Sequence, residues 1–169
     1  MTARIIGAVL IGAVSLYVGG AFCSMWQHRV QQLLSFGRLA EALGDGIGTM
    51  GLSVRHIVES FSDTVLENTG FLPAARTVWN DDPTAAALGT ALASCLPRLS
   101  LESEELALLS SFFDRLGSED RERECARCGY VHARLQALHE AAAGALSARC
   151  RIARTLSGAV GCAAALMLL

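Results

Sequence analysis

The feature that most constrains this chain is an uncharged, apolar run at each end. Residues 5–22 carry no charge, and a helix of this length is about the minimum that crosses a bilayer core. The run at the other end, residues 155–169, is shorter. It becomes long enough if the helix begins near Ile152, because the Arg154 side chain can extend to the interface. We therefore predict a transmembrane helix over 5–22, a domain over 27–150 and a second transmembrane helix over 152–169.

Arginine residues beside these runs predict the orientation. Basic residues gather on the side of each run that faces the middle of the chain, whereas only Arg4 lies beyond the first run. The side richer in Arg and Lys is normally cytoplasmic, and Trp is enriched at the headgroup level. We predict a cytoplasmic domain with both termini across the membrane, and these membrane-interface residues: Trp26, Arg29, Arg149, Arg151 and Arg154.

The alternative for the N-terminal run is a secretion signal removed after residue 23. It has the basic residue, apolar run and small residues of such a signal. Its length and the bulky Phe22 near the expected cleavage position favour an uncleaved anchor. The alternative leaves a secreted helical protein.

The composition excludes several functions. The chain has 169 residues and a net charge of −2, and all 14 basic residues are Arg, so we expect no nucleic-acid partner and no lysine chemistry. It has no phosphate-binding loop, no zinc-protease motif and no nucleophile elbow. We expect no enzymatic activity, no cofactor and no small-molecule substrate.

Helical spacing of apolar residues runs through the middle of the chain, which predicts an all-α domain of about six helices. Turn residues and prolines separate the predicted helices, which lie over 27–43, 53–65, 71–79, 82–95, 101–116 and from 118 onward. Asp82 and Pro83 suit the start of the fourth of them. Gly117 separates the last two, so these should pack antiparallel.

The last predicted helix has a heptad seam that includes Cys128, Val131 and Leu135. No proline interrupts it before the second apolar run, so we predict one long helix continuous with the second span. The charged segment 119–124 at its start suits a solvated helix terminus, or alternatively a docking patch for a basic partner.

Four of the six cysteines lie in predicted helices of the domain, and Cys23 and Cys162 lie in or beside the apolar runs, whereas disulfide frameworks are typical of small, loop-rich domains. We therefore expect reduced thiols. Cys125, Cys128 and His132, with Cys150 as a further ligand, are the one candidate for a metal or redox site. The simpler interpretation is that Cys125 and Cys128 are small apolar residues on a buried face.

The order of these features resembles the stage III sporulation protein AB family over nearly the whole chain. The similarity is strongest over 106–124, where Leu-Leu, Arg-Leu-Gly and Asp-Arg-Glu occur at the spacing of the family's helix junction. It continues into the basic entry Arg151-Ile-Ala-Arg154. Glu124 stands where the family often has Gln, and the capping role is expected to move to Ser118.

This resemblance implies a non-enzymatic membrane platform, located in the mother-cell membrane around the forespore, that belongs to the channel complex needed for endospore formation. It implies a cytoplasmic domain similar to type II secretion and type IV pilus platform proteins. The implied partners are a cytoplasmic hexameric ATPase, stage III sporulation protein AA, and the other membrane proteins of the stage III A operon. The junction residues are the candidate docking site: Leu116, Gly117, Ser118, Asp120, Arg121 and Glu122.

Overall fold

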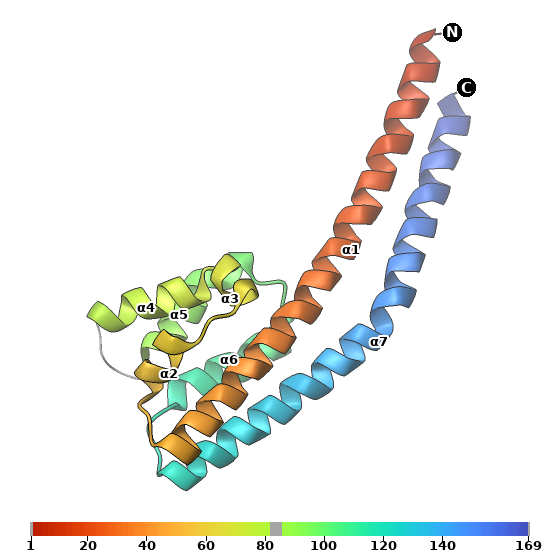
Figure 1. Ribbon diagram of the computed structural model, residues 1–169. Helices are drawn as coiled ribbons and strands as arrows, with labels where there is room; N and C mark the ends of the chain where they lie inside the picture. Colours follow the sequence, from red (N-terminus) through yellow and green to blue (C-terminus); the bar gives the residue numbers. More distant parts are fainter. Residues whose placement is uncertain (1, 82–85, 169) are drawn as a thin grey trace. The chain divides into compact units, whose positions relative to one another are not determined.

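The computed structural model describes residues 2–81 and 86–168. Side chains are not described for residues 1–12, 15–16, 80–86, 154, 161–162 and 164–169, so the predicted cap at Asp82 lies outside the described residues. The chain divides into two compact units (Figure 1). Unit 1 comprises Met1–His28 and Ala141–Leu169, and unit 2 comprises Arg29–Glu140. Every regular element in the described residues is helical, which confirms the all-α class.

The first helix, α1 (Thr2–Asp45), runs without interruption. The sequence predicted an apolar helix and a separate domain helix, and these are one element. α1 gives way to a π-helical turn, η1 (Gly46–Met50), and then to Gly51 with φ of 62°. Glycine adopts this left-handed conformation without a side-chain clash. The chain therefore stays helical to Met50 and breaks at Gly51, later than the predicted helix end at residue 43.

The predicted helix over 53–65 is in fact two helices, α2 (Val54–Ser60) and α3 (Thr64–Asn68). Asp63 causes the division. Its Oδ1 accepts hydrogen bonds from the backbone N–H groups of Val65 and Leu66, at 2.9 and 3.1 Å, and thereby caps a new helix. Helical spacing of apolar residues continues across such a cap, which is why the pattern alone did not reveal it.

Three further helices complete the middle of unit 2: α4 (Phe71–Asp81), α5 (Ala86–Cys95) and α6 (Ser103–Arg115), with a 3₁₀ turn η2 (Leu96–Arg98) after α5. Their core is aromatic. Phe36 of α1, Phe71 of α4 and Phe113 of α6 are each at most 1 % exposed. The ring centroids of Phe36 and Phe71 are 5.2 Å apart, and those of Phe71 and Phe113 are 5.4 Å apart. This contact joins three helices distant in sequence.

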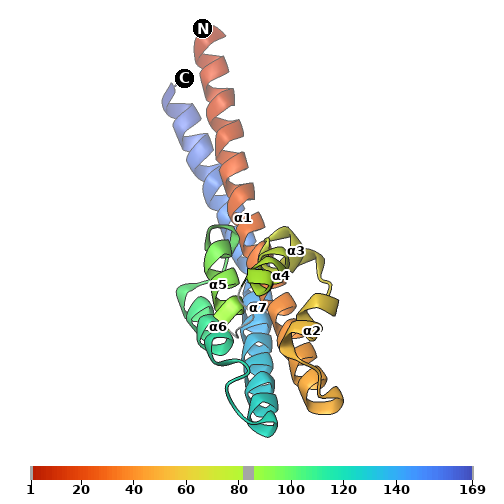
Figure 2. The ribbon, with the colours of Figure 1, turned by 90° about the vertical axis from the view of Figure 1, so that its left-hand side faces the viewer.

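The last helix, α7 (Arg121–Leu168), is continuous over 48 residues, as predicted. In unit 2 its heptad seam is buried: Cys128, Val131 and Leu135 are at most 3 % exposed. The seam packs on α1, because a Cβ at Gly44 would lie 3.2 Å from the Cβ of Cys128. Figure 2 shows α7 turning back beside α6, and hydrogen bonds between the two helices, described below, agree with the predicted antiparallel packing.

Unit 1 contains the N-terminal part of α1 and the C-terminal part of α7. Cys23 and Cys150 form a disulfide between them, so the expectation of reduced thiols is wrong for this pair, whereas Cys95, Cys125 and Cys128 are free.

Large apolar side chains of unit 1 are exposed on both helices, including Tyr17, Phe22, Ile152, Leu156 and Val160. Within the part of the chain that the structure describes, no helix combines the length and apolarity needed to cross a membrane.

Candidate functional site

The junction between α6 and α7 has a fixed backbone and a charged, exposed surface. Gly117 adopts φ of 81°, which reverses the chain, and Leu116 before it is fully buried. Residues 117–123 are all exposed. Leu116 therefore anchors the junction from beneath, while Gly117, Ser118, Asp120, Arg121 and Glu122 lie on its surface as the candidate docking residues.

Glu124 organises this junction, a role that the sequence pattern did not predict. Its side chain is buried, and its Oε1 accepts hydrogen bonds from the backbone N–H groups of Gly117 and Glu119, at 3.0 and 3.1 Å. Ser118 does not take the predicted capping role, because its Oγ donates to the Arg115 carbonyl instead. The sequence signal that could have identified Glu124 is an acidic residue in the first turn of a helix that follows a glycine-containing loop. At that position the carboxylate can accept hydrogen bonds from free backbone N–H groups that precede it.

Two arginines tie the junction to its surroundings. Arg127 donates to the Arg115 carbonyl at 2.7 Å and pairs with Glu119 and Glu124. Arg121 donates to the carbonyl of Gly48 in η1. Charge-assisted bonds of this kind hold backbone segments more firmly than neutral ones. The junction is therefore a pre-ordered surface built from α6, α7 and η1.

Arg29, one of the predicted membrane-interface residues, forms ion pairs with two carboxylates in unit 2. Its side chain is 13 % exposed and pairs with Glu102 and Glu105, the second at 2.7 Å. Burial lowers the pKa of Arg29, but the hydrogen bonds and charges of Glu105 and then Glu102 outweigh it and raise that pKa above its ordinary value. The same two carboxylates form the capping box of α6, so Arg29 joins α1 to the start of α6.

The other predicted membrane-interface residues belong to unit 1. The Arg149 guanidinium lies 5.9 Å from the ring centre of Trp26, within the range of a cation–π contact. Both are next to the disulfide in unit 1. Arg151 is exposed, and the Arg154 side chain lies outside the described residues.

The candidate metal cluster does not assemble. Within the residues the structure describes, no three side chains of metal-binding type are grouped closely enough to hold an ion. Cys125 Sγ lies 3.7 Å from the Gly44 carbonyl, and Cys150, the expected further ligand, is in the disulfide. Burial, followed by the charges of Glu124 and Cys125, raises the pKa of Cys128 to about 12. A thiol this weakly acidic is a poor metal ligand and nucleophile.

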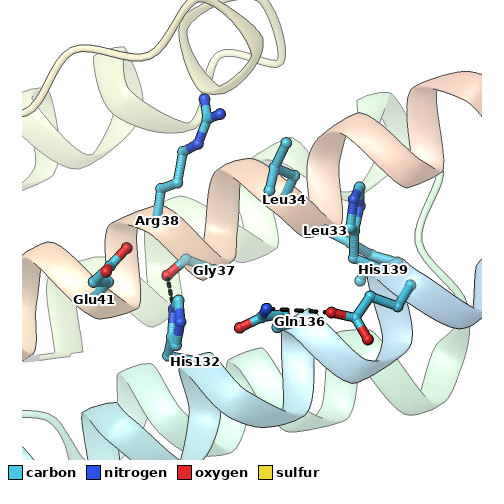
Figure 3. A pocket seen from close by; sticks show the side chains of 9 residues that line it. Leu33, Leu34, Gly37, Arg38, Glu41, His132, Gln136 and His139 are labelled. Carbon is cyan, nitrogen blue, oxygen red and sulfur yellow. Dashed lines mark hydrogen bonds between the residues drawn. The ribbon is translucent and has the colours of Figure 1, made fainter. Parts of the chain in front are cut away.

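His132 lines an open pocket between α1 and α7 with a volume of about 490 Å³ (Figure 3). Its Nδ1 is 2.9 Å from the Gly37 carbonyl, and Nδ1 of His139 is 3.0 Å from the Val30 carbonyl. These bonds attach α7 to α1 by side-chain N–H groups donating to backbone carbonyls. His132 is thus a helix-packing residue in this structure, and it is not brought together with Cys125 and Cys128.

The fold and site together define an all-helical protein with a pre-ordered, charged helix junction. The family model of stage III sporulation protein AB matches residues 4–169. The chain therefore belongs to the stage III sporulation protein AB family. No curated protein and no solved structure matched it.

Proposed function

We propose that this protein is a non-enzymatic membrane platform that docks a cytoplasmic ATPase to the channel complex between mother cell and forespore. Its family supports a role in sporulation. The observation that carries the docking proposal is the α6–α7 junction, whose backbone is held by Glu124 and Arg127 while its charged residues remain exposed. A pre-ordered surface binds without the entropic cost of ordering a loop.

The proposed location is the mother-cell membrane around the forespore, with two spans, a cytoplasmic domain and both termini on the far side. Support comes from apolar side chains exposed on the two helices of unit 1. Tyr17 is 79 % exposed and Val160 is 65 % exposed, and apolar surface of this kind is typical of a membrane or protein contact. The contact between Arg149 and Trp26 has the chemistry expected of a headgroup-level pair.

Cysteine labelling of intact protoplasts tests this topology. Ser111→Cys on α6 and a cysteine appended after Leu169 report the two sides. The full chain is expressed in a non-sporulating strain, in which the far side of the membrane is the outer surface of the protoplast. We expect a membrane-impermeant maleimide to label the appended cysteine only, with both labelled after lysis. Labelling of Ser111→Cys in intact protoplasts would refute the cytoplasmic placement of unit 2.

The proposed partners are stage III sporulation protein AA and the other membrane proteins of the stage III A operon. To test the first, we compare Asp120→Lys at the junction with Glu59→Lys on α2. Each replaces one exposed acid by a base, so the net charge changes equally. We expect Asp120→Lys to reduce co-purification of the ATPase at least tenfold and Glu59→Lys to leave it intact. Equal retention in both variants would exclude the junction as the docking site.

Neither alternative has comparable support. A metal- or redox-sensing site would require the thiols and His132 to converge, and they do not. A cleaved secretion signal would remove Cys23, which is bonded to Cys150, and would cut through the continuous helix α1.

A further inference from the structure

The Cys23–Cys150 disulfide lies where the proposed membrane spans meet the domain. Cys23 directly follows the apolar run 5–22, and Cys150 precedes Ile152, near which the second span is predicted to begin. Both cysteines then lie on the cytoplasmic side of the membrane, an inference that rests on the topology proposed above. Disulfides in a reducing cytosol are normally transient and take part in redox sensing or catalysis. A bond at this place is therefore expected to open and close.

The two sulfur atoms of this bond differ in accessibility. Cys23 is 4 % exposed, whereas Cys150 is partly exposed. Thiol–disulfide exchange requires a thiolate to reach a sulfur atom directly, so a reagent from solution meets Cys150 first. Cys23 is then the residue that reacts from within the protein. The free thiols Cys125 and Cys128 belong to unit 2, so this site is separate from the cluster that does not assemble.

Noncovalent contacts on both sides of the bond hold α1 and α7 together in unit 1. On one side, a Cβ at Gly19 would overlap the Ser157 hydroxyl and lie 3.4 Å from the Ala153 carbonyl, so the two helices approach closely. On the other side is the contact between Arg149 and Trp26. Both contacts are independent of the bond, so the two thiols stay near each other when it opens. Their effective concentration remains high, which favours closure.

The charge around this bond favours one kind of reagent. Unit 1 contains no Asp or Glu residue, whereas Arg149 and Arg151 flank Cys150 in the sequence. Both arginines are exposed. A region of one charge sign raises the local concentration of oppositely charged molecules. Low-molecular-weight thiols of the glutathione class carry carboxylates and a net negative charge, so they match this region.

We propose that Cys23 and Cys150 form a reversible exchange site for an anionic low-molecular-weight disulfide of the glutathione class. To close the bond, the Cys150 thiolate attacks one sulfur of glutathione disulfide, which forms a mixed disulfide and releases one glutathione thiolate. The Cys23 thiolate then attacks Cys150 Sγ and releases the second. The two glutathione thiolates take up the two protons that the cysteines lost. Two protein thiols are thus oxidised and one glutathione disulfide is reduced, and excess glutathione reverses both steps.

Trapping the mixed disulfide tests the order of these steps. The reduced full chain in detergent is exposed to glutathione disulfide, quenched with acid and mapped by mass spectrometry. Cys23→Ser blocks the second step, and we expect glutathione to accumulate on Cys150. In Cys150→Ser, the buried Cys23 should react at least about tenfold more slowly. Equal rates at the two positions, or modification of Cys150 no faster than that of the buried Cys95 in the same molecule, would overturn the proposal.

A reagent of opposite charge tests the selectivity. Cystamine is a cationic disulfide, and its reaction with Cys150 is compared with that of glutathione disulfide in the Cys23→Ser chain. We expect Arg151→Gln to slow glutathione disulfide about threefold and not to slow cystamine, because only the anionic reagent loses an attraction. Arg134→Gln, which removes an exposed arginine of α7 in unit 2, is the matched control and should change neither rate. An equal effect of Arg151→Gln on both reagents, or none, would contradict selection by charge.

Reversibility is measured on the wild-type chain in detergent, equilibrated with mixtures of glutathione and glutathione disulfide. We expect the bonded fraction to follow the ratio of the two and to reach the same value from the reduced and the oxidised protein. A Cys23–Cys150 bond that persists in excess glutathione would refute the exchange site and leave the proposed topology intact. Labelling of Ser111→Cys in intact protoplasts would refute the topology and leave this measured chemistry intact, so the two failures are distinguishable.

Discussion

At the scale of single residues, we expect the loss of the buried ion pair between Arg29 and Glu105 to reduce the stability of the fold most. Glu105 is a carboxylate that is 1 % exposed, and Arg29 is the cation beside it. We expect Arg29→Met to destabilise the protein by about 3–5 kcal/mol, since it leaves that charge buried and unpaired. Chemical denaturation followed by circular dichroism measures the change.

The matched control for that substitution is Arg134→Met. Arg134 pairs with Glu104 at 3.4 Å, but Glu104 is 82 % exposed, so its loss should cost less than about 1 kcal/mol. A similar loss in both variants would show that the Arg29 pair contributes no more than a surface pair.

Cys128 links residue chemistry to the pH dependence of stability. Its pKa in the folded protein is about 12, against an ordinary value of 9.0. Between these values the unfolded chain releases the proton and the folded chain retains it, so the free energy of unfolding falls as the pH rises above about 9. Cys128→Ala should flatten this decline. Urea denaturation at pH 8, 9 and 10 provides the measurement, and an equally steep decline in the variant would contradict the assignment.

At the scale of elements, Glu124 decides whether the α6–α7 junction is ordered. Glu124→Ala removes the acceptor for two backbone N–H groups, and we expect it to cost about 2–3 kcal/mol. Glu124→Gln keeps a carbonyl oxygen in place and should cost less than half as much. Hydrogen exchange at Gly117 and Glu119 is the direct readout, because only Glu124→Ala should accelerate it. Equal protection in both variants would mean that Glu124 does not hold the turn.

Much of the helix pattern could be predicted from the sequence, because amphipathic spacing and glycine turns are local signals. The buried face of α7 and the turn at Gly117 follow from them directly. The capping by Asp63 and the reach of Glu124 back to Gly117 could not, since each depends on which backbone groups a side chain finds in three dimensions. The ion-pair partner of Arg29 could not be predicted for the same reason, because Glu105 lies 76 residues away in the sequence.

At the scale of the whole molecule, the Cys23–Cys150 disulfide encloses all of unit 2. The two cysteines are 127 residues apart, so an intact bond restricts the unfolded ensemble of every residue between them. In the chain-entropy account, a loop of this length contributes roughly 5 kcal/mol to stability. The core around Phe36, Phe71 and Phe113 belongs to unit 2 alone, so the folded domain itself does not require the bond.

We therefore expect reductant to lower the denaturation midpoint of the wild-type chain without changing its folded spectrum. Cys23→Ser should have the lower midpoint from the start and should not respond to reductant, which separates loss of this bond from any effect on the free thiols. A peptide linking Cys23 to Cys150, found by mass spectrometry before reduction and missing from Cys23→Ser, identifies the bond. A wild-type midpoint that is the same with and without reductant would show that the disulfide does not stabilise the domain it encloses.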